Sequence, residues 1–380
     1  MELSRQFPAD SLSPRFDFHL GMSYAALGEP QRAQEHLTRA IALEPARLQY
    51  RYQFARVLSQ SGQYADAAEQ LRRCIAMDST YLPARFQLGL AIAAQRNDPF
   101  AEMEVFTGLV ERNPNDVLSL YHLSEALKRA GQPDSAAVFL RRALAVNPRY
   151  VPALIALSNH LNGQKRYAEA LPLYLRADSV RGGNKDLLFQ IGECYRRLGE
   201  LPSARSYFRR AIALDSMNGL YHAQLAYAYF SDALYDSSIA SYRTALLFDE
   251  ENAQYHLNLA LVYAKLDDRP NVLRSYAEAV RVMHPELAAA VFYDQGTYCF
   301  QKKLWKEAVT AYGRAIDIDP ALSLAYYFKG SCLMQLNEHA AALPLFTEFL
   351  SRTKESTEFK GERYSAQKMS DYIKELRKKK

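Results

Sequence analysis

One position of the sequence, most often alanine, recurs at intervals of 34 to 36 residues along almost the entire chain. It opens a short motif that reads AIALEP from Ala40 and returns as AIDIDP from Ala315. The aligned positions are Ala40, Cys74, Leu109, Ala143, Ala177, Ala211, Ala245, Ala279, Ala315 and Phe349. Self-similarity at a fixed period of this length is the signature of repeat architectures. The chain is therefore expected to grow by addition of similar units and not around a single core.

Other positions keep the same phase and predict helices. Ala204 stands seven residues before Ala211 and bulky Phe208 stands three before it, and this spacing returns in most units. Earlier in the unit comes a Leu-Gly-x-x-Tyr type motif, such as residues 191–195. Residues three, four and seven apart share one face of a helix, and a turn with Gly and Pro at residues 197–202 separates the two apolar stripes. Each unit is predicted to be a helix pair that completes its core by stacking on its neighbours.

The spacing resembles the tetratricopeptide repeat (TPR) family, whose signature runs W-x2-L-G-x2-Y, then A-x3-F, then a closing P. The resemblance covers residues 14–354. It implies an all-α fold, a right-handed α-α superhelical solenoid of about ten TPR helix pairs with a C-terminal capping helix. The sequence departs from the signature at its first position, where the family has tryptophan and this chain has Asp17, Arg51, His222, His256 or Phe292.

The domain organisation is predicted from the phase of the repeat. Residues 1–13 are expected to be a loose N-terminal segment, residues 14–354 the TPR solenoid, and residues 355–380 the capping helix with a basic tail. The expected units span residues 14–47, 48–81, 82–116, 117–150, 151–184, 185–218, 219–252, 253–288, 289–322 and 323–354. The apolar stripe of the capping helix is Met369, Tyr372, Ile373 and Leu376. Such an end helix shields the last apolar face of a solenoid.

Charge argues against a nucleic-acid partner. Of the 47 Lys/Arg and 42 Asp/Glu, ten and five lie in residues 351–380, which leaves 37 of each sign in the rest of the chain. Proteins that bind nucleic acid usually carry a basic stripe over the body. No apolar run of about 18 residues is present, so no integral membrane segment is expected. As the chain stands we expect it to be cytoplasmic, whereas a trimmed N-terminal signal would place it in the periplasm or on a membrane anchor.

The sequence lacks the motifs that carry catalysis or cofactors. GxGxxG, GxxxxGK[ST], HExxH and GxSxG are all absent. His222 and His256 lie one repeat apart, and they are interpreted as packing residues at the first signature position. The cysteines also occupy packing positions and are expected to be reduced, with no disulfide and no zinc. They are Cys74, Cys194, Cys299 and Cys332. The chain is thus expected to be no enzyme and to need no cofactor.

The resemblance implies a binding surface. In this family the first helices line a concave groove that holds extended peptides or partner helices, at places 2, 5, 9 and 12 of each unit. The candidate groove residues are Tyr52, Arg56, Phe86, Tyr121, Glu125, Asn159, Phe189, Glu193, Arg196 and Tyr227. Aromatic side chains with a few charges are typical of interfaces, although tyrosine at place 5 is also common as a structural residue. No unit has lysine at place 5, which argues against an adaptor for chaperone C-termini.

Three functions remain open. The first is a non-enzymatic interaction scaffold whose concave groove binds a peptide or partner protein. The second is a structural or assembly subunit of a larger complex, such as a cell-envelope or secretion complex, which would also bind through its edges and outer face. The third is a regulatory repeat arm of an enzyme partner. The oligomeric state is left open.

Overall fold

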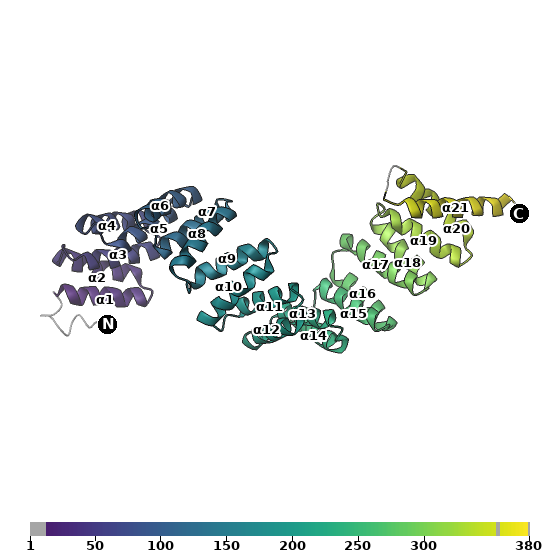
Figure 1. Ribbon diagram of the computed structural model, residues 1–380, viewed down its shortest axis with the longest axis horizontal. Coiled ribbons are helices and arrows are strands. Elements are labelled where there is room, and N and C mark those ends of the chain that lie inside the picture. The colour runs from purple at the N-terminus through teal and green to yellow at the C-terminus, as the bar shows by residue number, and fades with distance from the viewer. Residues whose placement is uncertain (1–12, 355–357, 379–380) are drawn as a thin grey trace. The chain divides into compact units, whose positions relative to one another are not determined.

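The computed structural model describes residues 13–354 and 358–378, and every regular element in these ranges is a helix. The expected loose segment 1–13 lies, apart from Ser13, outside the described residues. The chain divides into two compact units, Met1–Gly182 and Gly183–Lys380, and each is described by itself. Figure 1 shows the helices of each unit laid side by side in chain order. Within the described ranges no helix is long and apolar enough to cross a membrane.

The helices follow one another in pairs. In the first unit they are α1 (Pro14–Ala26), α2 (Pro30–Leu43), α3 (Leu48–Gln60), α4 (Tyr64–Met77), α5 (Leu82–Arg96), α6 (Pro99–Arg112), α7 (Val117–Arg129), α8 (Pro133–Val146), α9 (Val151–Gly163) and α10 (Tyr167–Val180). In the second unit they are α11 (Lys185–Arg197), α12 (Leu201–Leu214), α13 (Gly219–Ser231), α14 (Tyr235–Phe248), α15 (Ala253–Lys265), α16 (Arg269–Val282), α17 (Ala288–Gln301), α18 (Trp305–Ile318), α19 (Ser323–Gln335), α20 (His339–Arg352) and α21 (Lys360–Lys378). A short 3₁₀ turn, Pro285–Leu287, precedes α17.

Each odd-numbered helix up to α19 packs on the even-numbered helix that follows it, and within each unit that helix packs on the next pair. The turn inside every pair contains one residue with positive φ, which reverses the chain after the first helix. Glycine takes this place at Gly131 and Gly199, since it has no Cβ to clash. Lys165, Ala233 and Lys303 adopt the same backbone conformation without that advantage. The helix pairing is therefore set by turn geometry as well as by apolar faces.

The small and bulky positions of the repeat meet in the core. A Cβ added to Gly192 on α11 would lie 2.7 Å from the ring of Phe208 on α12, which is fully buried. Gly296 approaches Tyr312 in the same way, at 2.8 Å. The glycine of the first helix thus makes room for the aromatic ring of the second, and this close approach explains their fixed spacing. The all-helical repeat fold predicted from the sequence is confirmed.

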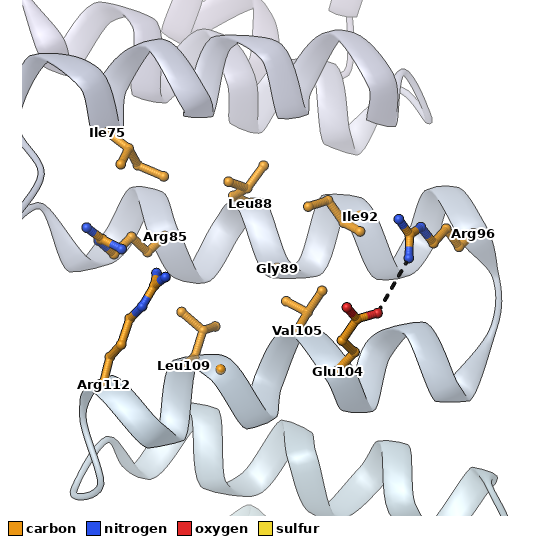
Figure 2. Close-up of a pocket in the computed structure, with 11 residues that line it drawn as sticks. Ile75, Arg85, Leu88, Gly89, Ile92, Arg96, Glu104, Val105, Leu109 and Arg112 are labelled. Carbon is orange, nitrogen blue, oxygen red and sulfur yellow. Dashed lines mark ion pairs between the residues drawn. The ribbon is translucent and has the colours of Figure 1, made fainter.

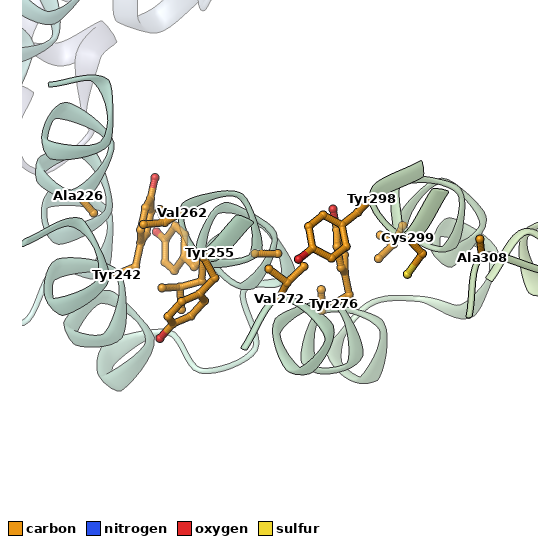
Figure 3. Close-up of a cluster of buried hydrophobic side chains, with 14 of the residues drawn as sticks. Ala226, Tyr242, Tyr255, Val262, Val272, Tyr276, Tyr298, Cys299 and Ala308 are labelled. Carbon is orange, nitrogen blue, oxygen red and sulfur yellow. The ribbon is translucent and has the colours of Figure 1, made fainter. Parts of the chain in front are cut away.

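One core cluster of the second unit is rich in tyrosine (Figure 3). Figure 3 shows Tyr242 and Tyr255 packed near Val262, and Tyr276 with Tyr298 beside Val272. Cys299 belongs to the same cluster. All four cysteines are free and buried, and their burial agrees with the prediction that they are packing residues.

The first signature position makes a contact that the family pattern does not suggest. Arg51, Arg85 and His222 each donate a hydrogen bond from the side chain to the carbonyl oxygen six residues earlier, in the loop before their helix. The His256 ring lies at the same place, with Nε2 3.4 Å from the Glu250 oxygen. His222 also stacks on Phe248 with ring centroids 5.6 Å apart. These side chains hold the loop between repeats against the helix that follows it, so both histidines make a structural contact, although to the loop and not between helices as expected.

The helix α21 covers the end of the last pair. Ala366 is fully buried there, and Met369 and Phe359 pack beside Phe346 and Phe349 of α20, which are themselves fully buried. Tyr372, expected in the apolar stripe, is instead half exposed. The side chains of Ile373 and Leu376 lie outside the described residues.

Removal of residues 355–380 is expected to destabilise the second unit and to make it self-associate. Exposing one large apolar side chain costs about 1.5–3 kcal/mol, and two phenylalanines lose their cover. Thermal unfolding and light scattering of the chain 1–354, compared with the full chain, check this. Tyr364→Ala is the matched control, because Tyr364 lies on α21 and is 64% exposed. A truncated chain with the same Tm and the same light scattering as the full chain would contradict the capping role.

Candidate functional site

The candidate groove residues lie on the first helices of successive repeats, and these repeats belong to both compact units. Tyr52 and Arg56 lie on α3, Phe86 on α5, Tyr121 and Glu125 on α7, and Asn159 on α9 of the first unit. Phe189, Glu193 and Arg196 lie on α11 and Tyr227 on α13 of the second unit. Asn159 and Tyr227 are exposed, and the other eight are half-buried. The two groups are therefore considered as two separate surfaces.

The aromatic residues at place 5 are largely engaged inside the fold. Tyr121 meets Tyr150 edge-on, with ring centroids 5.7 Å apart, and Tyr52 meets Tyr81 in the same manner at 5.4 Å. Burial, and after it the charge of Glu125, raises the pKa of Tyr121. Such aromatic pairs contribute about 0.5–1.5 kcal/mol beyond their buried area. These two candidate aromatic side chains thus contact the loop at the end of their own repeat.

The other two aromatic candidates at place 5 show the same behaviour. Phe86 lies 5.2 Å from the ring of His122, and burial lowers the pKa of that histidine. In the second unit Phe189 packs on Tyr221 at 5.2 Å and on the fully buried Phe208 at 5.8 Å. Arg56 donates a hydrogen bond to the neighbouring Gln53 at 3.1 Å. None of these side chains lines the small hollow of the first unit that is described below.

Polar side chains of the first unit gather at a small hollow between α7, α8 and α9. It is lined by Ser124, Glu125, Lys128, Pro133, Ala136, Leu140, Ala156, Asn159 and His160, and its volume is about 120 Å³. Glu125 and Asn159 hold the same place in successive repeats, so the stacking of α9 beside α7 brings them to one cavity. A space of this size holds part of one amino-acid residue and is far smaller than the usual site for a cofactor, which is about 300–1,000 Å³.

A buried tyrosine orients the amide of Asn159. The Tyr174 hydroxyl on α10 donates a hydrogen bond of 2.5 Å to Oδ1 of Asn159, and the Tyr174 side chain is fully buried. Since Oδ1 faces the tyrosine, the amide NH₂ of Asn159 is directed away from it. An exposed side chain is in this way held in one orientation by a rigid buried group, and its donor is available to a ligand.

The surface of the second unit is an ion pair covered by an aromatic ring. Arg196 donates two parallel hydrogen bonds of 2.8 Å to Glu193, from Nε and Nη2. The side chains of the pair are 11% and 17% exposed. The Tyr227 ring, 41% exposed, lies over the guanidinium with 4.9 Å between Cζ and the ring centroid. Bidentate pairs of this kind are geometrically specific, so the Tyr227 ring packs on a guanidinium that is held in one position.

Sequence reasoning missed two residues that line the hollow. Ser124 and His160 lie one place before and one place after the candidate position of their own repeats. A search of places 8 to 10 across two successive repeats would have found both, whereas Lys128 lies at place 12, which was expected to face the groove. His160 lies 3.4 Å from the Asp134 carboxylate. In the described ranges no cluster of three or more His, Cys, Asp or Glu could hold a metal ion.

The sequence matches models of the tetratricopeptide repeat over most of its length. One model covers residues 52–117, 121–186 and 304–356, and two further models of the same repeat cover residues 186–218 and 18–47. Together the matched residues are more than half of the chain. Comparison with curated proteins gave no significant match.

Several solved structures are similar to the chain. YrrB, described as a TPR protein with an unusual peptide-binding site, is 20% identical, with 48% of this chain and 93% of YrrB covered and a TM-score of 0.44. Yeast Tom70 is 16% identical, with 99% and 90% covered and a TM-score of 0.41. MamA is 19% identical, with 43% and 95% covered and a TM-score of 0.40.

Proposed function

Because this chain belongs to the tetratricopeptide repeat family and is a protein-interaction scaffold, we propose that it binds an extended peptide of a partner protein, without catalysis, across the first helices of its repeats. The hollow between α7 and α9 is the anchor of this site. The observation that carries the proposal is the Asn159 amide, exposed to solvent and held in one orientation by buried Tyr174.

The chemistry of the hollow suits a peptide backbone. The amide NH₂ of Asn159 donates a hydrogen bond to a carbonyl oxygen of the ligand. This bond costs little conformational entropy, because the Asn159 side chain is already held in one orientation. Leu140 and Ala136 form an apolar floor that receives a small side chain of the next ligand residue. Lys128 is exposed, and Glu125 lies in the same hollow, so the wall carries one charge of each sign. A peptide with polar groups of both signs is therefore preferred over a uniformly acidic or basic one.

The second unit offers a separate contact to the same kind of ligand. Tyr227 exposes one ring face beside the bidentate pair of Glu193 and Arg196. Tyrosine contributes a large, rigid contact area with few rotatable bonds, and aromatic residues dominate binding energy at interfaces.

The test starts from a random dodecapeptide library displayed on phage and selected against the full chain. Titration calorimetry then measures the affinity of each enriched peptide for variants of the hollow. We expect Asn159→Ala to weaken binding at least tenfold, since a lost hydrogen bond in a desolvated site costs about 1–3 kcal/mol. Tyr174→Phe should weaken binding by about threefold to tenfold, because the amide loses its orientation while its atoms remain.

The matched control is the double variant Val138→Ala/Arg141→Ala on α8. Both residues are exposed and lie outside the hollow, so its affinity should equal that of the native chain. Circular dichroism and thermal unfolding must first show that all variants are equally folded. Enrichment of no peptide, or equal affinities of the native chain and Asn159→Ala, would overturn the proposal.

A further inference from the structure

A second and larger pocket lies in the first unit, between α4, α5 and α6 (Figure 2). Its volume is about 360 Å³, which is within the range of ordinary ligand sites. It contains none of the candidate groove residues. Its lining is Ile75, Arg85, Leu88, Gly89, Ile92, Arg96, Glu104, Val105, Gly108, Leu109 and Arg112.

The middle of the pocket is apolar. Figure 2 shows Leu88 and Ile92 along α5, Val105 and Leu109 along α6, and Ile75 reaching over from α4. All five side chains are half-buried. Apolar side chains left partly open in a concave site gain free energy when a ligand covers them. The pocket is thus suited to an aliphatic or aromatic side chain.

The two ends of the pocket differ in charge. At one end Arg96 faces Glu104, with 3.9 Å between Nη1 and Oε2, so the charges offset each other. At the other end Arg85 lies near the start of α5, and Arg112 extends from α6 toward it (Figure 2). Arg85 donates to the Ser79 carbonyl oxygen at 2.7 Å and 2.9 Å through Nη2 and Nε, which fixes the guanidinium and leaves Nη1. Within the described part of the chain no acidic side chain forms an ion pair with either arginine.

A glycine inside α6 keeps the pocket open. Gly108 lies in the last third of the helix, and a Cβ built on it would meet no atom within 4 Å. The glycines that face a partner ring, such as Gly192, have an evident packing role, but Gly108 has none. Glycine inside a helix is less stable than alanine. Gly108 therefore costs helix stability, and the space beside it belongs to the pocket.

The pocket adjoins a second hollow that extends its length. This hollow has a volume of about 210 Å³ and is lined by Ser79, Leu82, Arg85, Phe86, Leu109, Arg112, Asn113, Asp116 and Ser119. Arg85, Leu109 and Arg112 line both cavities. Asp116, the one acid in the second hollow, accepts hydrogen bonds from its own helix start at Ser119. The two arginines therefore stand at the middle of a longer channel with an excess of positive charge.

We propose that this pocket binds a partner peptide through a carboxylate that stands next to an apolar side chain. The carboxylate lies between Arg85 and Arg112, and the apolar side chain covers Leu88, Val105 and Leu109. Guanidinium groups bind carboxylates with strong, directed hydrogen bonds. The channel continues on both sides of the arginines, which suits a polypeptide that extends past its acidic group. The carboxylate comes from an Asp or Glu side chain or from the C-terminus of the partner.

The test uses short synthetic peptides on a sensor surface, probed with the full chain. Each peptide carries Leu, Phe, Ile, Val or Met next to Asp, Glu or a free C-terminus. Its matched partner carries Asn, Gln or a C-terminal amide, so that size is kept and charge is lost. At least one acidic peptide is expected to bind ten times more tightly than its amide partner. Comparison of the peptides that carry Asp, Glu or a free C-terminus distinguishes a side-chain carboxylate from a C-terminal one.

Two variants place the binding in this pocket. Arg112→Gln removes one arginine and Gly108→Leu fills the cavity, and each is expected to lower the acid-dependent affinity at least tenfold. Gly108→Ala is expected to raise Tm by about 2–4 °C, which shows that this helix tolerates a side chain here. Arg72→Gln and Thr107→Leu are the controls, since both residues are exposed and line neither cavity.

The outcomes separate this proposal from the first one. The acid preference should persist in Asn159→Ala, whose hollow lies between other helices. Equal binding of every acidic peptide and its amide partner would overturn the proposal. An acid preference that survives both Arg112→Gln and Gly108→Leu would overturn it as well, because the carboxylate would then bind elsewhere.

Discussion

Replacement of Phe208 by alanine is expected to lower the unfolding free energy of the second unit by about 3–5 kcal/mol, as for other fully buried phenylalanines. Phe208 has no exposed surface, and its ring lies against Gly192 and 5.8 Å from the ring of Phe189. Truncation leaves a cavity between α11 and α12 where the ring had packed. Urea unfolding followed by circular dichroism measures the loss. A change below 1 kcal/mol would contradict the core described above.

Gly192→Val tests the same contact from the other side. The added Cβ would lie 2.7 Å from the Phe208 ring, so the valine should cost about 1–3 kcal/mol through overpacking. In the double variant the valine enters the space left by the ring. We therefore expect the double variant to be less destabilised than the sum of the two single ones. Strict additivity would show that the two residues do not share one space.

Alkaline pH is expected to unfold the second unit well before the first. Burial raises the pKa of Cys194 and of Cys299 from 9.0 to about 11, and that of Cys332 to about 12. Below pH 9 these thiols are neutral in both states, and their contribution to stability is fully present. Above pH 9 the unfolded chain loses the protons first, so the unfolding free energy falls by up to about 1.4 kcal/mol per pH unit for each thiol.

Buried tyrosines extend this effect to higher pH. Burial raises the pKa of Tyr276 and of Tyr221 to about 12, and both belong to the second unit, whereas Cys74 is the cysteine of the first unit. Trp305 is the single tryptophan and lies in the second unit, so its emission reports that unit. Between pH 9 and 11 the urea midpoint from Trp305 emission should fall before the midpoint from circular dichroism.

A variant with alanine at all four cysteines is the control for the thiols. It should lose the part of the decline that begins near pH 9 and keep the later part that the tyrosines cause. The tyrosine part begins only near pH 10, where the hydroxyls of the unfolded chain ionise, because burial raises the pKa of Tyr276 and of Tyr221 from 10.0 to about 12 in the folded state. A urea midpoint that stays constant from pH 7 to pH 11 in the native chain would contradict the burial of these groups.

The fold could be predicted because each repeat carries its own packing rule. Where two helices approach, Gly192 and Ala211 are small and Phe208 is large. This pattern can be read from the spacing of residues within a single repeat. The cysteines were predictable for the same reason. The prediction for the capping helix was wrong at Tyr372, which is half exposed. An end helix packs against a neighbour on one side only, so the sequence pattern defines its buried face less precisely.

The candidate site could be predicted only in part. Helical phase placed Glu125 and Asn159 on one surface, but it did not show that Tyr174 from another helix orients the amide. The contact of Tyr121 with Tyr150 is equally invisible to phase, since it depends on where the loop between repeats returns. Arg85 and Arg112 lie 27 residues apart in sequence and line one pocket because α5 and α6 pack against each other. These contacts and the pocket depend on the direction of side chains and on the shape of the cavity. Neither can be predicted from the spacing of residues alone.

The most direct test of the peptide-binding account is photo-crosslinking of a selected peptide with photoleucine at each position in turn, followed by mass spectrometry of the full chain. The account predicts crosslinks to α7 and α9 around Asn159 and Lys128, and their loss in Asn159→Ala. Crosslinks confined to the exposed residues Val138 and Arg141 of α8 would contradict it and place binding on the second helices.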